Sequence, residues 1–119
     1  MEVFLLGSHP DTEFHTARDL RGGEFGVGLE DVYRGHVGLA AFRHQWGEAW
    51  EELHVETEQV VDCGERCVVL LRMLARGKAS GLETDQPMGQ VITWRDGTAR
   101  RIDMYMDHAE ALEAVGLRE

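Results

Sequence analysis

The stretch RIDMYMDHAEALEAVG, residues 101–116, changes its period half-way along and thereby decides the fold class. Apolar residues at 102, 104 and 106 alternate with polar or aromatic residues at 103, 105 and 107, which predicts a strand with one apolar face. From residue 108 the spacing becomes helical and closes at a glycine, which predicts a terminal helix over 108–115. We therefore expect Ile102, Met104 and Met106 to point inward, with Asp103 and Tyr105 on the other side.

The rest of the chain predicts further strands and one long helix. Helical spacing covers residues 36–50, and strand patterns cover 11–16, 53–63, 67–76, 82–94 and 99–107. Residues 18–35 contain five glycines and read as a loop, and residues 3–6 read as a short helix. This order predicts an α+β fold, a cone-shaped curved antiparallel sheet with helices across its concave side, because long strands must twist and bend.

Composition narrows the function classes. The 119 residues correspond to a single domain, residues 1–119, and they carry a formal net charge of −10. An acidic chain without a basic stripe is a poor partner for nucleic acid, because phosphate backbones attract lysine and arginine. The sequence has no apolar run of membrane-span length and no positively charged signal region at its start, so we expect a cytoplasmic protein with no membrane partner. Its two cysteines, Cys63 and Cys67, could face each other across a hairpin, and we expect them to be free thiols in that compartment.

Four segments carry a family resemblance: VYRGHVGLAAF (32–42), ERCVVLLRMLARGKASG (65–81), DQPMGQVITWRDG (85–97) and MYMDHAEALEAVGL (104–117). Together they resemble the SnoaL-like branch of the nuclear transport factor 2-like superfamily, over roughly residues 10–117. The resemblance implies a cystatin-like roll with an interior cavity. It also implies that the N-terminal helix is shortened or absent here, because only eight residues precede His9. Relatives include polyketide cyclases, ketosteroid isomerases, limonene epoxide hydrolases and binding proteins, so the fold alone does not name a function.

The resemblance also shows what is missing. In the family's hydrolases and cyclases an aspartate projects into the cavity from the last strand, and Met104 occupies that position. Tyr105 and Asp107 match the family's tyrosine and terminal aspartate. An earlier arginine–aspartate pair is represented by Arg72 and Leu74, and an arginine alone cannot act as a general base at neutral pH.

These considerations favour a protein that binds a small apolar or partly polar molecule, without a metal or cofactor and as a homodimer. Buried polar residues need partners, so Gln90 is expected to bond either a neighbouring strand or the ligand, and Arg72 either binds a ligand or lies on the outer face. We expect the following residues to line the pocket: Phe14, Phe42, Trp46, Trp50, Leu70, Arg72, Leu74, Gln90, Trp94, Met104 and Met106.

Two alternatives remain open from the sequence. The first is an isomerase, cyclase or hydrolase that uses Asp103 and Tyr105 as a cavity carboxylate and tyrosine together with Arg72; a one-residue bulge in the last strand would turn that face inward. The second is an interaction module whose interior is filled by its own side chains.

Overall fold

The computed structural model describes residues 8–16, 31–48, 50–78 and 81–117. The helix expected at residues 3–6, and with it the question of a shortened N-terminal helix, lies outside these ranges. So does most of the loop expected at 18–35. In the described part of the chain, no helix is long and apolar enough to cross a membrane.

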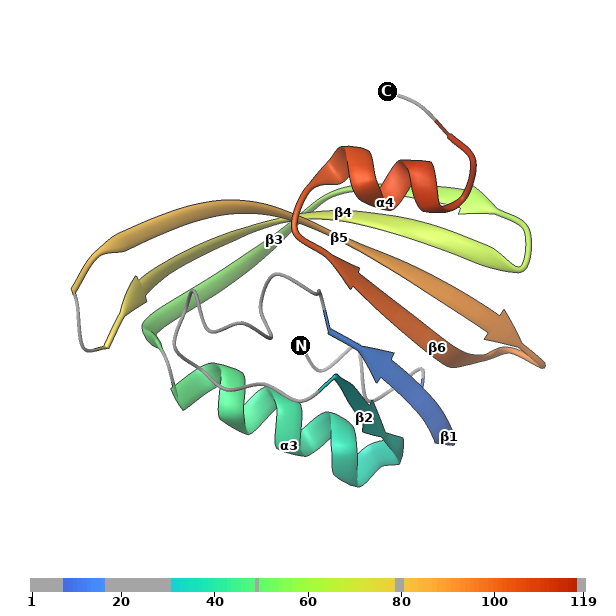
Figure 1. Ribbon diagram of the computed structural model, residues 1–119, viewed down its shortest axis with the longest axis horizontal. Coiled ribbons are helices and arrows are strands. Elements are labelled where there is room, and N and C mark those ends of the chain that lie inside the picture. Colours follow the sequence, from blue (N-terminus) through green and yellow to red (C-terminus); the bar gives the residue numbers. More distant parts are fainter. Residues whose placement is uncertain (1–7, 17–30, 49, 79–80, 118–119) are drawn as a thin grey trace.

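Six strands and two helices follow one another along the chain (Figure 1). In order they are β1 (Ser8–His15), β2 (Val32–Arg34), α3 (Gly35–Glu48), β3 (Trp50–Cys63), β4 (Arg66–Gly77), β5 (Glu83–Arg95), β6 (Thr98–Tyr105) and α4 (His108–Ala114). The α+β prediction and every expected strand are confirmed. Two details were wrong: β2 lies inside the expected loop, and the helix stops at Glu48, so that Trp50 begins β3.

The strands form one curved sheet in the order β2-β1-β6-β5-β4-β3. The sheet is mixed and not antiparallel throughout, because β1 runs parallel to β6 while all other neighbours are antiparallel. Figure 1 shows the sheet arching between the two helices, with α3 on its concave side and α4 on its outer side. The expectation that both helices cross the concave side is therefore corrected for α4.

Two glycines explain how α3 begins. Gly35 has a φ of 66°, a conformation that costs glycine little, and it turns the chain from β2 into the helix. At Gly38, an added Cβ would lie 3.0 Å from the backbone carbon of Tyr33. The missing side chain therefore lets the helix pack directly on β2.

The sheet has a hydrophobic cluster on each side. The larger one joins α3 residues such as Leu39, Phe42 and Trp46 to the concave face of the sheet. The smaller one joins Ala111 and Leu112 of α4 to the outer face. Strand β4, next to the edge strand β3, contributes to both clusters, so the two clusters lie back to back on the sheet.

Candidate functional site

An aromatic row on α3 faces the concave side of the sheet. The Phe14 and Phe42 rings have centroids 4.5 Å apart, and the Phe42 and Trp46 rings stack at 6.2 Å. Trp50 then meets Trp46 edge-on at 5.5 Å. The four side chains belong to one buried cluster, so β1, α3 and β3 together supply a continuous row of packed rings.

Methionines from the sheet face these rings. Ile102 and Met104 are 1% and 5% exposed and belong to the concave cluster, and the partly buried Met106 packs against it. The predicted sidedness of β6 is thus confirmed. The strand does contain a register shift, between Thr93 and Trp94 on β5 and opposite Arg100 on β6. Because that shift precedes Ile102, it leaves the methionine side facing inward.

Gln90 is a polar residue on the concave face, which we call the concave wall where Met88, Ile92, Ile102 and Met104 line it. It is 9% exposed, lies directly opposite Met104 on the neighbouring strand, and shares its side of β5 with Met88 and Ile92. Within the part of the chain that the structure describes, its side chain forms no hydrogen bond to protein. Of the two partners that the sequence left open, a neighbouring strand or a ligand, the first is not found among the described residues. Trp94 lies further along the same strand, half-buried, and its indole N–H donates to Cys67 Sγ at 3.3 Å.

Three residues expected in the pocket lie on the other face. Leu70 belongs to the cluster under α4, and by the unbroken alternation of β4 Arg72 and Leu74 point the same way. The concave face of β4 instead presents Leu71, Met73 and Ala75. The expectation that Leu70, Arg72 and Leu74 share a pocket wall with Met104 is therefore corrected.

Arg72 binds carboxylates on the outer face. Its Nη1 donates to Asp85 Oδ1 at 2.6 Å, and its Nε lies 3.6 Å from Glu58 Oε1. The hydrogen bond to Asp85, followed by the charge of Asp85, raises the pKa of Arg72 above its ordinary value. This arginine is engaged by the protein itself, as expected for a solvent-facing ion pair.

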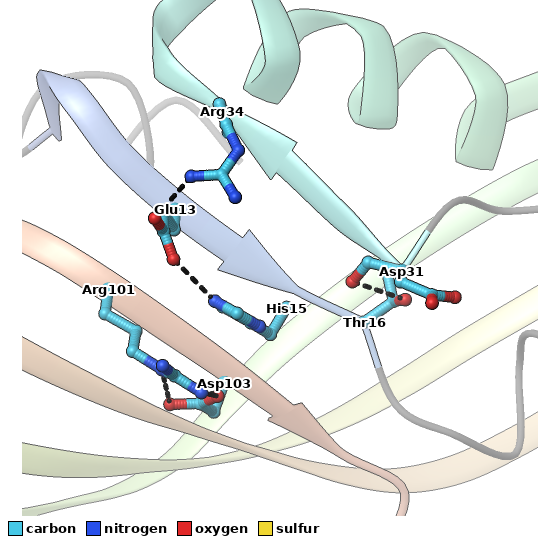
Figure 2. Close-up of polar contacts among 7 residues, drawn as sticks. All are labelled: Glu13, His15, Thr16, Asp31, Arg34, Arg101 and Asp103. Carbon is cyan, nitrogen blue, oxygen red and sulfur yellow. Dashed lines mark hydrogen bonds and ion pairs between the residues drawn. The ribbon is translucent and has the colours of Figure 1, made fainter.

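A second polar group occupies the outer face where β1 meets β6 (Figure 2). Glu13 bonds His15 Nε2 at 2.9 Å through one oxygen and accepts from Arg34 through the other. The hydrogen bonds from His15 and from Arg34 lower the pKa of Glu13 below its ordinary value. On the neighbouring strand Arg101 donates to both oxygens of Asp103.

Asp103, Tyr105 and Arg72 do not meet at one site. Asp103 is held by Arg101, whereas Tyr105 packs against the cluster under α4, where burial raises the pKa of its hydroxyl. Arg72 lies on β4, so β5 separates it from both of them. Strands lie about 4.8 Å apart, so roughly 10 Å separates the backbones of β4 and β6, and among the described residues no contact joins Arg72 to Asp103 or Tyr105. All three point away from the methionine wall.

Open grooves lie at the ends of the sheet. One of about 870 Å³ is lined by residues of β3, β4 and β5, including His54, Leu74, Arg76 and Asp85. Another, of about 560 Å³, lies between hairpin turns and is lined by Arg95, Arg100, Arg101 and Trp94 among others. Neither groove contains a residue of α3 or a methionine, although the first includes Leu53 and Ala75 of the concave cluster.

Metal ligands are not grouped in the described ranges. Among those residues, no three His, Cys, Asp or Glu side chains are placed to hold a metal ion. Cys63 and Cys67 are both free thiols, but they do not face each other: Cys63 packs with the α4 cluster, whereas Cys67 contacts Trp94 on the concave side. The register pairs them with Arg66 and Asp62 instead, so the expected facing arrangement was wrong.

Sequence reasoning missed the contribution of Tyr33, Met73 and Ala75 to the concave cluster. Tyr33 is 2% exposed, and its hydroxyl donates to Gln45 of α3. The alternation of Tyr33 with its two neighbours was the available signal for β2, but five glycines in the same segment concealed it. Met73 and Ala75 were missed because both sides of β4 are apolar.

Comparison with known proteins gives a family and a fold. The model of a family described as the SnoaL-like domain matches residues 8–102. Curated protein sequences give no significant match.

Three solved structures are similar over most of their length. TerC, co-crystallised with polyporic acid, is 24% identical, with a TM-score of 0.74 over 96% of this chain and 84% of its own. A nuclear transport factor 2-like protein of unknown function from Burkholderia pseudomallei is 20% identical, with a TM-score of 0.75 over 94% and 82%. A protein with a ketosteroid isomerase-like fold from Catenulispora acidiphila, in complex with trimethylamine, is 13% identical, with a TM-score of 0.69 over 94% and 78%. At these identities the likeness establishes the fold alone.

Proposed function

The chain belongs to the SnoaL-like domain family, and on that premise we propose that it binds a small, largely apolar molecule between α3 and the concave face of the sheet. The observation that carries this proposal is the continuous row of Phe14, Phe42, Trp46 and Trp50 rings opposite methionine side chains. Flat rings and adaptable thioethers together suit an apolar ligand. The crystal structures of TerC with polyporic acid and of the Catenulispora protein with trimethylamine support a ligand-binding role for this fold.

Binding without catalysis is favoured because the concave wall offers no buried carboxylate, histidine or lysine in the described chain. The buried polar residues in the described chain are Thr12, Thr16 and Gln90, none of which is an acid or a base, and the hydroxyl of the buried Tyr33 already donates to Gln45. General acid–base catalysis needs a titratable group within hydrogen-bond reach of the ligand. The enzymatic alternative with Asp103, Tyr105 and Arg72 would need a ligand on the outer face, where Asp103 and Arg72 are already engaged in ion pairs.

The experiment uses the three tryptophans as position markers. Isotope-labelled protein is titrated with indane, a neutral apolar probe, while the indole N–H resonances are followed by NMR. A Trp94→Phe variant assigns one resonance, and Trp46→Phe assigns another. A ligand between α3 and the sheet shifts the resonance of Trp46, whose ring stacks on Phe42. The absence of a saturable shift of any of the three indole resonances contradicts the proposal.

We also propose that the chain forms a homodimer in the cytoplasm. Within the described chain, α4 packs on β4, β5 and β6, and its cluster reaches β3 at Val61 and Cys63, which leaves the outer face of β1 and the rest of β3 for a second copy to cover. The two free thiols suit a reducing compartment. Native mass spectrometry at micromolar concentration tests the assembly, and a monomer mass alone contradicts it.

A further inference from the structure

Gln90 is a buried carboxamide among mainly apolar residues on the concave face. The carboxamide carries two N–H donors and one oxygen acceptor, and the side chain is nine-tenths buried beside Met88, Ile92 and Met104. In proteins, a large majority of buried polar side-chain atoms have hydrogen-bond partners. No partner for Gln90 exists among the described residues.

Gln86 provides an internal comparison on the same side of the same strand. Its Nε2 donates to Met106 O at 2.8 Å and to Pro87 O at 2.9 Å. The sheet therefore satisfies one glutamine amide with its own carbonyl groups and leaves the next one along the wall open.

We infer that Gln90 is the recognition group of the proposed site, and that the ligand is a neutral, mainly apolar molecule with one carbonyl or hydroxyl group that bonds this carboxamide. The inference rests on the proposed function and adds the ligand's polar chemistry to it. A neutral ligand follows because the described buried residues include no charged side chain to pair with an ionic one. A single polar group follows because Gln90 is the one buried polar side chain on the concave side of β5, and it has no protein partner in the described chain.

The test compares two probes of nearly the same shape, 1-indanone and indane, which differ by one carbonyl oxygen. Dissociation constants are measured by ligand-detected NMR for the wild type, for Gln90→Met and for the matched control Gln86→Met. Methionine keeps the length of glutamine and removes its hydrogen bonds. Wild type and Gln86→Met are expected to prefer 1-indanone over indane by about two- to tenfold, the range of one neutral hydrogen bond, and Gln90→Met is expected to lose that preference.

The outcomes separate this inference from the proposed function. If both probes bind and the preference is the same in Gln90→Met as in the wild type, the role of Gln90 is refuted while ligand binding stands. If neither probe binds any of the three proteins, the proposed function and the inference fall together.

A thermal melt without ligand gives an independent readout. Gln90→Met is expected to melt at or above the wild-type temperature, because no protein hydrogen bond is lost, whereas Gln86→Met is expected to melt lower. Should Gln90→Met melt well below the wild type, and Gln90→Leu behave in the same way, Gln90 has a protein partner and the inference fails.

Discussion

Met104 lies in the concave wall, directly opposite Gln90 and 5% exposed. Replacement by aspartate would place a carboxylate among apolar side chains, and Arg72 cannot compensate because it lies on the outer face. We expect Met104→Asp to lower the free energy of unfolding by about 2–5 kcal/mol at pH 7. Burial raises the pKa of the new carboxyl group, so the loss should shrink as the pH falls and the group becomes neutral. Urea unfolding at pH 7 and pH 5 measures both effects.

Val60→Asp is the matched control for this substitution, because Val60 is 59% exposed on β3. It introduces the same charge where water solvates it, so we expect a change within about 0.5 kcal/mol. If Met104→Asp were as stable as the wild type, position 104 would face solvent, and the assignment of Met104 to the concave side of β6 would be wrong.

The orientation of β6 could be predicted from sequence because one of its sides is apolar and the other polar. The orientation of Arg72 could not be predicted, because both faces of β4 are apolar: one packs toward α3 and the other toward α4. A strand that is covered on both faces loses the two-residue period that separates inside from outside. Arg72 interrupts the outer row, and only the positions of Asp85 and Glu58 reveal that this row reaches solvent there.

Glu13 gives the outer face one source of pH dependence. Its pKa is lower in the folded chain than the ordinary value of 4.5, because His15 and Arg34 bond the charged form. A group with a depressed folded pKa stabilises the protein above its unfolded pKa, and that contribution is lost as the pH falls through the folded value. Glu13→Gln should therefore lower the melting temperature at pH 7, and the difference from the wild type should diminish below about pH 4.

The control is Glu113→Gln, on the exposed side of α4, where the glutamate forms no ion pair within the described chain. Its melting temperature should follow that of the wild type at both pH values. A Glu13→Gln difference that stays constant from pH 7 to pH 3 would mean that the contacts of Glu13 contribute by packing and not by charge.

Helix α4 approaches the sheet most closely where Ala111 packs on Gly89 of β5. A Cβ built on Gly89 would lie 2.4 Å from Ala111 Cβ, a distance that forces the helix to move. We expect Gly89→Ala to reduce the free energy of unfolding by about 1–3 kcal/mol, the usual range for overpacking. Chemical denaturation followed by far-ultraviolet circular dichroism measures this loss.

A double mutant tests the cause. Ala111→Gly removes the clashing methyl and on its own costs about 1 kcal/mol of helix propensity. The double mutant Gly89→Ala with Ala111→Gly should therefore lose less free energy of unfolding than the two single mutants lose in total. Gly47→Ala in α3 is the control, because an added Cβ meets nothing within 4 Å there. That control should stabilise by up to about 1 kcal/mol. Simple additivity in the double mutant would exclude the steric explanation.

Sequence patterns located most elements but misjudged two boundaries for physical reasons. Trp50 continues the apolar stripe of α3, so periodicity assigned it to the helix, although its backbone already pairs with Gly77 on β4. The short β2 is stabilised by pairing with β1 and by the packing of α3 against Tyr33. A local sequence pattern does not encode these contacts. By contrast, the Asp96-Gly97 turn was recognisable, and both residues have the positive φ angles that such a hairpin needs.

The whole molecule has two hydrophobic clusters back to back on one sheet, and their placement depends on topology. The parallel pairing of β1 with β6 brings Phe14 beside Ile102, next to Met104. Residues so far apart in the chain are joined only by the global fold, so the sequence could predict an apolar wall but not its full membership. The same topology sets the Glu13–His15 pair beside Arg101 and Asp103 on the outer face (Figure 2).

The net charge of −10 should govern how the whole molecule responds to salt. Exposed ion pairs such as Arg76–Glu52 contribute at most about 1 kcal/mol each and are weakened by screening, whereas like-charge repulsion across the whole surface is relieved by it. With 22 acidic and 12 basic side chains, repulsion is expected to dominate. The melting temperature at pH 7 should therefore rise by a few degrees between about 10 and 150 mM sodium chloride, a range over which the screening length falls from about 30 to 8 Å. The rise should be smaller near pH 4.5, where many carboxylates are neutral. A fall in melting temperature with salt at pH 7 would show instead that the ion-pair rows of the outer face contribute more to stability than the excess negative charge costs.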